Sequence, residues 1–270
     1  MKLIMGLKKF YLGLVLFFMY APILILMVFS FNASRSRNAW GGFTLDWYIR
    51  LFQDNEIMRA LRNTLLVAIF STIAAVIIGT FAAISLDKIG KRKRRIIMSI
   101  SKLPVMMPDI VTGLTLMALF LFIFRFFGFG GLGFGTLLLA HIIFNVPYVI
   151  LSVLPKLRQL DPNLFEAALD LGSKPFPAFI KVVLPEIWPG VITGALLAFT
   201  LSVDDFMVSF FTTSPSVQNL SIQIFSMTRR GIDPRINALS TLIFVVIMLL
   251  LFLINKRDQH LIRKRNNEEN

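Results

Sequence analysis

Six long apolar runs constrain the fold of this chain more than any other feature of its sequence. Each run approaches or exceeds the roughly 20 residues that a helix needs to cross a bilayer. Hydrophobic residues make up 56% of the 270 positions, too many for a soluble domain with a solvated surface. The sequence therefore predicts an all-α integral membrane protein with six transmembrane helices. The runs lie near residues 10–31, 60–86, 97–124, 136–154, 187–212 and 238–254.

Basic residues predict how these spans are oriented. The net charge is +13, and Lys and Arg gather at the start of the chain, in the second and fourth connections, and after the last span. These four regions fall on one side of a six-span arrangement. By the positive-inside rule that side is cytoplasmic, so both termini are expected in the cytoplasm. The same clustering argues for contact with anionic membrane lipid and against a nucleic-acid partner.

This arrangement predicts one large membrane domain with short polar ends. Residues 1–9 are expected to form a cytoplasmic N-terminus, residues 10–254 the six-helix domain, and residues 255–270 a basic cytoplasmic tail. The first apolar run resembles a signal peptide but is too long and lacks a small-residue cleavage site, so we expect it to be a retained helix. The domain includes a cytoplasmic connection at 155–186.

The cytoplasmic connection contains a short polar module. Asp161 is a suitable N-cap, with Pro162 at the favoured first helical position. Gly172 is placed to end that helix in a left-handed conformation, and Ser173 can cap a second short helix. Pro185 is expected to break the chain before the fifth span. From spacing alone, an ordinary amphipathic interfacial helix remains an equal alternative.

The residues of this module resemble the "EAA" signature of binding-protein-dependent ABC importer permeases. Val182 replaces the Ile that is usual in the signature, which is a mild departure. The resemblance implies the type I importer permease fold, and it implies that the connection docks on an ATPase subunit. The matching residues are Glu166, Ala167, Ala168, Gly172, Leu184 and Pro185.

Three further segments resemble spermidine/putrescine permeases within that family. They are Ser30–Asn32, Met107–Val111 and Phe199–Phe206. The likeness implies a multi-pass subunit in a bacterial inner membrane that imports spermidine and/or putrescine. It also implies a second homologous permease, a dimer of ATP-binding subunits and an extracytoplasmic polyamine-binding protein as partners.

Carboxylates inside apolar runs are the candidate substrate ligands. An ionised Asp at the centre of a bilayer costs about 2.5–3.5 kcal/mol even on the insertion scale, so Asp204 and Asp205 need water, a cation or a partner subunit. Asp109 is a further candidate, and the ring of Trp47 could add a cation–π contact at the outer mouth. The alternatives are a polar helix contact or proton relay for Asp204 and Asp205, a helix cap for Asp109, and interfacial anchoring for Trp47.

Several chemistries find no support in the sequence. No phosphate-binding G-x-x-x-x-G-K-[ST] loop is present, so ATP and its Mg²⁺ are expected on the partner ATPase and the chain itself is expected to be a non-catalytic permease. Without Cys, and with two distant His, a resident metal site is not expected. His141 is interpreted as a packed or hydrogen-bonded residue.

Other functions remain open at this point. The chain could serve an importer for another small solute, such as ferric ion, thiosulfate or phosphonate, although an anionic substrate would leave Asp204 and Asp205 unexplained. A proton-coupled secondary transporter would use these acids as its relay. A membrane scaffold that only anchors a soluble protein is a third alternative.

Overall fold

The computed structural model describes residues 2–35, 39–128, 130–161, 163–231, 233–246 and 248–249. Helices dominate these residues, whose one isolated β-bridge joins Asn32 to Phe43. Within the described part of the chain, five helices are long and apolar enough to cross a membrane: Lys8–Phe29, Asn55–Lys88, Asp109–Phe127, Phe134–Leu157 and Pro175–Asp204. A shorter apolar helix, Pro234–Val246, begins the sixth predicted span. The end of that span and the predicted tail at 255–270 lie outside the described residues.

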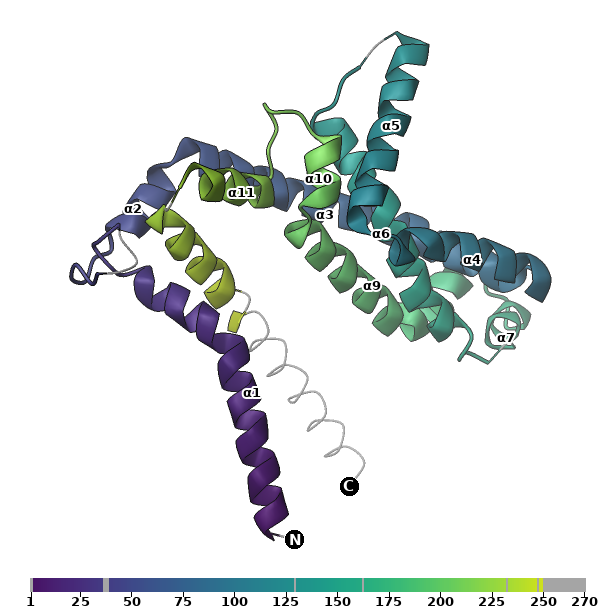
Figure 1. Cartoon of the computed structure of the whole chain (residues 1–270). Helices are drawn as coiled ribbons and strands as arrows, with labels where there is room; N and C mark the ends of the chain where they lie inside the picture. Colours follow the sequence, from purple (N-terminus) through teal and green to yellow (C-terminus); the bar gives the residue numbers. More distant parts are fainter. Residues whose placement is uncertain are drawn as a thin grey trace. The chain divides into compact units, whose positions relative to one another are not determined.

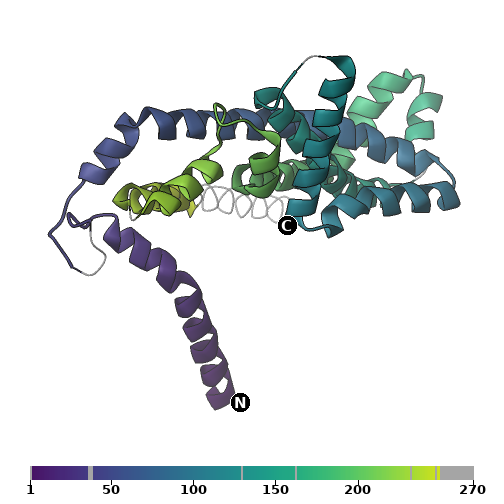
Figure 2. The ribbon, with the colours of Figure 1, turned by 45° about the horizontal axis from the view of Figure 1, so that its top comes forward.

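The chain divides into two compact units, the first drawn from residues 1–58 and 224–270. Its main helices are α1 (Lys2–Phe29), α2 (Asp46–Gln53) and Pro234–Val246. Helix α1 bends along its length (Figures 1 and 2), as expected of a helix that contains Pro22. No residue in the membrane-length apolar window of α1 is buried within the chain. A helix that is apolar all round and unburied suits a lipid or protein environment rather than water.

The connection after α1 is organised around the buried side chain of Asn32. Its carboxamide oxygen accepts the backbone N–H groups of Ser34 (3.1 Å) and Gly41 (2.8 Å). The backbone carbonyl of Asn32 accepts the indole N–H of Trp47 at 2.7 Å. Ser30 adds a hydroxyl contact of 2.7 Å with Tyr48. The segment Ser30–Asn32 therefore holds the connection and α2 in one fixed arrangement.

The second unit, residues 59–223, contains the remaining helices. Helix α3 (Asn55–Lys88) runs into it from the first unit, and α11 (Leu220–Arg230) leaves it. Between them come α4 (Lys91–Met106), α5 (Asp109–Phe127), α6 (Phe134–Leu157), α7 (Leu164–Asp170), α8 (Pro175–Ala178), the π-helical turn η1 (Phe179–Val183), α9 (Leu184–Asp204) and α10 (Met207–Thr212).

The core of this unit lies where α3, α6 and α9 meet. Small residues allow the close approach of α6 and α9. A Cβ atom added at Gly190 would lie 2.8 Å from the carbonyl oxygen of Ser152, and one at Gly194 would lie 3.1 Å from the Cα of Val149. The spacing Gly-x-x-x-Gly is typical of tightly packed membrane helices. The buried core residues include Ala75, Ala83, Val149, Val153, Ile187 and Ala198.

The predicted third span, 97–124, is wrong as a single helix. Helix α4 ends at Met106 and α5 begins at Asp109. Met107 is extended, with φ −80° and ψ 147°, because a residue before proline is driven out of the α region. Pro108 then precedes α5 as its N-cap. In Figure 1 the two helices point in different directions.

The predicted fifth span, 187–212, is also broken. Helix α9 ends at Asp204, residues 205–206 are not helical, and α10 starts at Met207. Figure 1 shows that α10 does not continue along the axis of α9. The expected break at Pro185, by contrast, does not occur. The helix is continuous from Pro175 to Asp204, because the wider turn η1 accommodates the carbonyl that the proline nitrogen cannot bond.

The polar module differs from its prediction at both helix starts. The N-cap of α7 is Asn163 rather than Asp161, and Asp161 instead accepts the N–H of Asn163 (2.9 Å) in a local turn. The N-cap of α8 is Lys174 rather than Ser173, because the helix begins at Pro175, the residue type favoured at the first helical position.

The predicted end of α7 is confirmed. Gly172 has φ +85°, the left-handed region that glycine tolerates best. The N–H of Gly172 donates to the carbonyl of Leu169 (2.8 Å), and that of Ser173 donates to the carbonyl of Ala168 (3.1 Å). This pair of bonds is a Schellman motif. It turns the chain sharply between α7 and α8.

Candidate functional site

A cavity of about 350 Å³ lies at the break between α9 and α10. It forms where a helix end from α9 meets the start of α5 and one face of α6. Its lining residues are Pro104, Asp109, Thr112, Phe144, Tyr148 and the α9–α10 residues Thr200, Leu201 and Asp204–Val208. The structure thus brings three of the four candidate pathway residues, Asp109, Asp204 and Asp205, to one cavity.

Asp109 and Asp204 are the exposed acids of this cavity. Asp109 is the first residue of α5, where the helix N-terminus favours a negative charge. Asp204 is the last residue of α9, where the partial negative charge of the helix end adds to its own. Among the residues that the structure describes, neither carboxylate forms an ion pair. The two acids give the cavity a negative charge, and Phe144 and Tyr148 form part of its lining.

Asp205 lies in a different environment from its neighbour Asp204. Its side chain is only 8% exposed. One carboxylate oxygen accepts both the backbone N–H and the hydroxyl of Ser209, each at 2.7 Å. The other accepts the backbone N–H of Val208 at 3.2 Å. The carboxylate therefore caps the first turn of α10.

A second layer of buried polar residues surrounds this cap. His141 on α6 is 1% exposed, and its Nε2 lies 3.0 Å from the Ser209 hydroxyl and 3.6 Å from Asp205. The expectation that His141 is a hydrogen-bonded, packed residue is confirmed. Nearby, Asn145 donates to the Ser202 hydroxyl at 2.7 Å. Asn145 was not predicted from the sequence, although an amide side chain within an apolar run indicates a buried polar contact.

Trp47, the fourth candidate pathway residue, does not line the cavity. It belongs to the first unit, where its side chain is 7% exposed and donates to the carbonyl of Asn32. The guanidinium of Arg50 lies 5.5 Å from the centre of its ring. These contacts place Trp47 in the framework of the connection between α1 and α3.

The signature residues lie in the polar module at the other end of α9. Glu166 and Ala167 are exposed on α7, and Gly172 is exposed at its end, whereas Ala168 is half-buried. Leu184 starts α9 and packs against the core, with Pro185 exposed beside it. The module thus has an exposed surface on α7, while Leu184 and Pro185 belong to α9, the helix that ends at Asp204.

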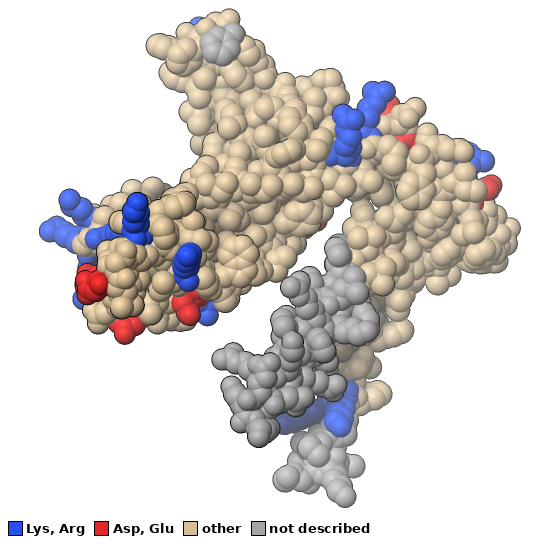
Figure 3. Space-filling view, turned by 180° about the vertical axis from the view of Figure 1, so that it is seen from behind, with Lys and Arg blue, Asp and Glu red and all other residues tan. Residues whose placement is uncertain are grey.

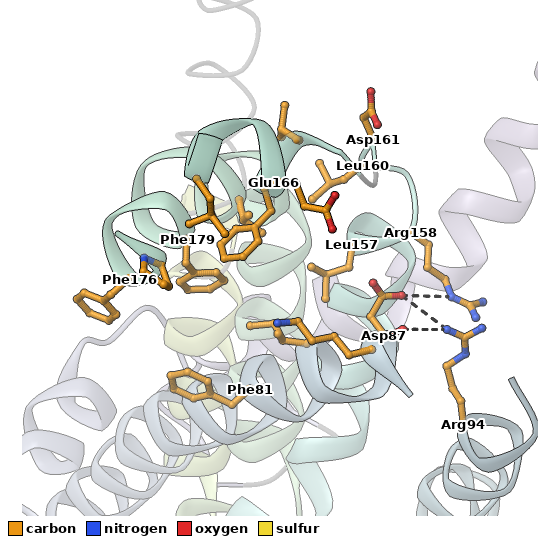
Figure 4. Close-up of a pocket in the computed structure, with 17 residues that line it drawn as sticks. Phe81, Asp87, Arg94, Leu157, Arg158, Leu160, Asp161, Glu166, Phe176 and Phe179 are labelled. Carbon is orange, nitrogen blue, oxygen red and sulfur yellow. Dashed lines mark hydrogen bonds and ion pairs between the residues drawn. The ribbon is translucent and has the colours of Figure 1, made fainter. Parts of the chain in front are cut away.

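A second cavity, of about 1120 Å³, separates the polar module from the ends of α3 and α6. Its aromatic lining residues are Phe165 and the three labelled in Figure 4, Phe81, Phe176 and Phe179. At one edge, the carboxylate of Asp87 lies 3.7 Å from Arg94 and 4.0 Å from Arg158. These ion pairs link α3, α4 and the segment that follows α6. Figure 3 shows a group of charged side chains at the end of the second unit that carries α4 and α7.

The comparisons with known proteins identify the family. Residues 75–266 match the model of the binding-protein-dependent transport system inner membrane component family. The chain belongs to this family. Members of the family are inner-membrane components of transport systems, which agrees with the membrane-length helices found here.

Two curated relatives within the family cover most of the chain. The putrescine transport system permease protein PotI of Escherichia coli (strain K12) is 39% identical over 228 residues, 84% of this chain and 81% of its own length. The spermidine/putrescine transport system permease protein PotC of Haemophilus influenzae is 36% identical over 261 residues, 97% of this chain and 98% of its own.

A solved structure shows the same fold. The chain is similar to a chain in the crystal structure of a bacterial ABC transporter involved in the import of the acidic polysaccharide alginate, with a TM-score of 0.71 and 16% identity. The match covers 95% of this chain and 98% of that one. It establishes the importer permease fold for this family member.

Proposed function

We propose that this chain is the transmembrane permease subunit of an ATP-driven importer for polyamines, spermidine and/or putrescine, in a bacterial inner membrane. The observation that carries the proposal is the cavity at the α9–α10 break, where Asp109 and Asp204 face the same space. The names of the relatives PotI and PotC support the substrate class. The carboxylates give that class a physical reason.

The cavity suits an organic polycation. Each ammonium group of a polyamine gains a charge-assisted hydrogen bond from a carboxylate. The rings of Phe144 and Tyr148 line the same space and can each contribute a cation–π contact of about 0.5–2 kcal/mol. An anionic solute would meet two uncompensated carboxylates, which argues against thiosulfate or phosphonate.

The polar module is the proposed coupling site for an ATPase. Glu166, Ala167, Ala168, Gly172, Leu184 and Pro185 form the signature. The helix Pro175–Asp204 is continuous over 30 residues, a length of about 45 Å at the rise of an α-helix. We expect a displacement at the module to be transmitted to Asp204 along this continuous helix.

The proposed assembly contains several other chains. A second homologous permease supplies the other wall of the pathway, two copies of an ATP-binding subunit hold ATP and Mg²⁺, and an extracytoplasmic polyamine-binding protein delivers the substrate. In this assembly the chain has six spans, both termini are cytoplasmic, and its basic end contacts anionic lipid.

Transport by the complete reconstituted complex tests the proposal. Proteoliposomes should accumulate labelled spermidine or putrescine when ATP and the binding protein are present. They should not accumulate thiosulfate, phosphonate or ferric ion. Accumulation of one of these other solutes in place of polyamines would reject the substrate. Polyamine uptake that follows a proton gradient without ATP would support the proton-coupled alternative instead.

A further inference from the structure

We infer that the adjacent acids of the α9–α10 break have different roles: Asp205 is a positioning residue that caps α10 and fixes the break, and Asp204 is the residue that faces the substrate. The inference rests on the proposed function for its substrate. Its structural half, the role of Asp205, stands on the hydrogen bonds of the described residues.

The oxygens of Asp205 are already engaged by the protein. Together they accept three hydrogen bonds, from the N–H of Val208 and from the N–H and hydroxyl of Ser209. Charge-assisted bonds of this length are among the stronger ones in proteins. Because a carboxylate has about four lone-pair positions, a substrate ammonium would compete with these three donors, and displacing them would remove the cap from the first turn of α10.

The cap is itself tied to two other elements. The carboxamide of Asn219 donates to the backbone carbonyl of Asp205 (3.0 Å) and to the Ser209 hydroxyl (2.7 Å). Its oxygen accepts the N–H of Ile222 at the start of α11 (3.0 Å). The donors and acceptors of this network agree when His141 carries its proton on Nε2 and donates to Ser209. The break is thereby fixed to α6 on one side and to α11 on the other.

Asp204 has none of these constraints. Its side chain is exposed in the cavity, and no hydrogen bond or ion pair of the described residues holds it. It follows Ser202 by two positions, and Ser202 is anchored by Asn145 and lies 3.1 Å from Ser71. The end of α9 is thus fixed before Asp204 and directly after it. The fixed backbone presents a carboxylate that is ready for a cation.

The two roles predict that replacement by Asn is tolerated at position 205 but not at position 204. Asn caps helices about as well as Asp, so Asp205→Asn removes the charge but keeps a side-chain oxygen that can accept from Ser209. Asp205→Ala removes the charge and the acceptor. At position 204 the charge itself binds the substrate, so Asn is no better than Ala. A ligand role for Asp205 would instead make its Asn and Ala variants equally poor.

The experiment compares these four variants in the complete transporter by spermidine uptake and by the Tm of the purified complex. We expect Asp205→Ala to lower Tm and to reduce the maximal uptake rate about fivefold or more, while Asp205→Asn keeps about a third or more of the wild-type rate. Asp204→Asn and Asp204→Ala should keep the wild-type Tm and raise KM about tenfold.

Two results would overturn the inference. One is an Asp205→Asn variant that raises KM as much as Asp204→Asn at an unchanged Tm, because Asp205 would then bind substrate through its charge. The other is an Asp205→Ala variant with a wild-type Tm. If Asp205→Ala does not assemble, Asp205→Asn and Ser209→Ala decide, with only Ser209→Ala expected to lower Tm clearly. Absence of polyamine uptake in the wild type would reject the proposed function, whereas the Tm pattern would still test the cap.

Discussion

The carboxylates of this chain differ in what they face. In the first unit, Arg235 holds Asp233 through paired hydrogen bonds of 3.0 and 2.6 Å and also contacts Asp54. Asp54 in turn accepts the N–H groups that start α3, at 2.9 and 3.1 Å. These acids fix the connections between helices. The charges of Asp109 and Asp204 are not paired within the described residues, and we propose that these two acids of the cavity act on a ligand.

The Asp233–Arg235 pair should make the stability of the first unit depend on pH. Burial raises the pKa of Asp233, but the hydrogen bonds and charge of Arg235 outweigh it and hold that pKa below its ordinary value. A lowered pKa in the folded state stabilises the protein above the ordinary Asp pKa of about 4 and ceases to do so as the pH falls further. The Tm of the wild type should therefore fall more steeply below about pH 5 than that of Arg235→Gln.

The matched control is Arg230→Gln, which removes the same charge from an exposed position of the same unit. It should keep the pH dependence of the wild type. Equal acid sensitivity in the wild type and in Arg235→Gln would show that the pair contributes nothing to stability.

At the scale of elements, the continuous helix from Pro175 to Asp204 joins the polar module to the acidic cavity. It packs on α6 through Gly190 and Gly194. Replacing Gly194 by Leu should force the helices apart and lower stability by about 1–3 kcal/mol, seen as a lower Tm and a lower yield of complex. Gly135→Leu is the control, because a Cβ at Gly135 meets nothing within 4 Å. Similar Tm values for the two variants would argue against close packing of α6 and α9.

The polar module allows a separate test of coupling. Gly172→Asp places a side chain at φ +85°, where residues other than glycine are strained by about 1 kcal/mol or more. It also adds a charge at the exposed end of α7. We expect this variant, and Glu166→Lys, to lose co-purification with the ATPase or to lose ATP-dependent uptake.

Gly90→Asp is the control for coupling, since Gly90 has φ −57° and open space around it. It should bind the ATPase and transport normally. A Gly172→Asp variant that does the same would remove the module from the coupling path.

The spans were predictable where apolarity and helix coincide. Length and hydropathy located α1, α3 and α6, because one helix continues through each of these apolar runs despite the prolines in α1 and α6. They failed at Met107 and at Asp205–Phe206, where the apolar run continues through a local break. A window that averages over a span cannot detect a change in two backbone residues. Pro185 produced the opposite error: a break was predicted there, but the helix continues through it because the π-helical turn η1 accommodates the proline.

The cavity was predictable in its charges but not in its geometry. Acids within apolar runs were a strong signal because the free-energy cost of a charge in the membrane indicates a function. Spacing could not show that Asp205 caps α10 while Asp204 faces the cavity. The partners that separate their roles come from distant positions, such as His141, 68 residues from Ser209. Only the folded chain brings them together.

For the whole molecule, one continuous helix connects the proposed coupling module to the proposed cation site. The most direct test is the concentration dependence of ATP-driven spermidine uptake by proteoliposomes that contain the complete transporter, with either the wild-type chain or Asp204→Asn. We predict ATP-dependent uptake whose KM rises about tenfold in the variant at an unchanged Tm. Uptake without ATP, or an identical KM in the two proteins, would contradict the account.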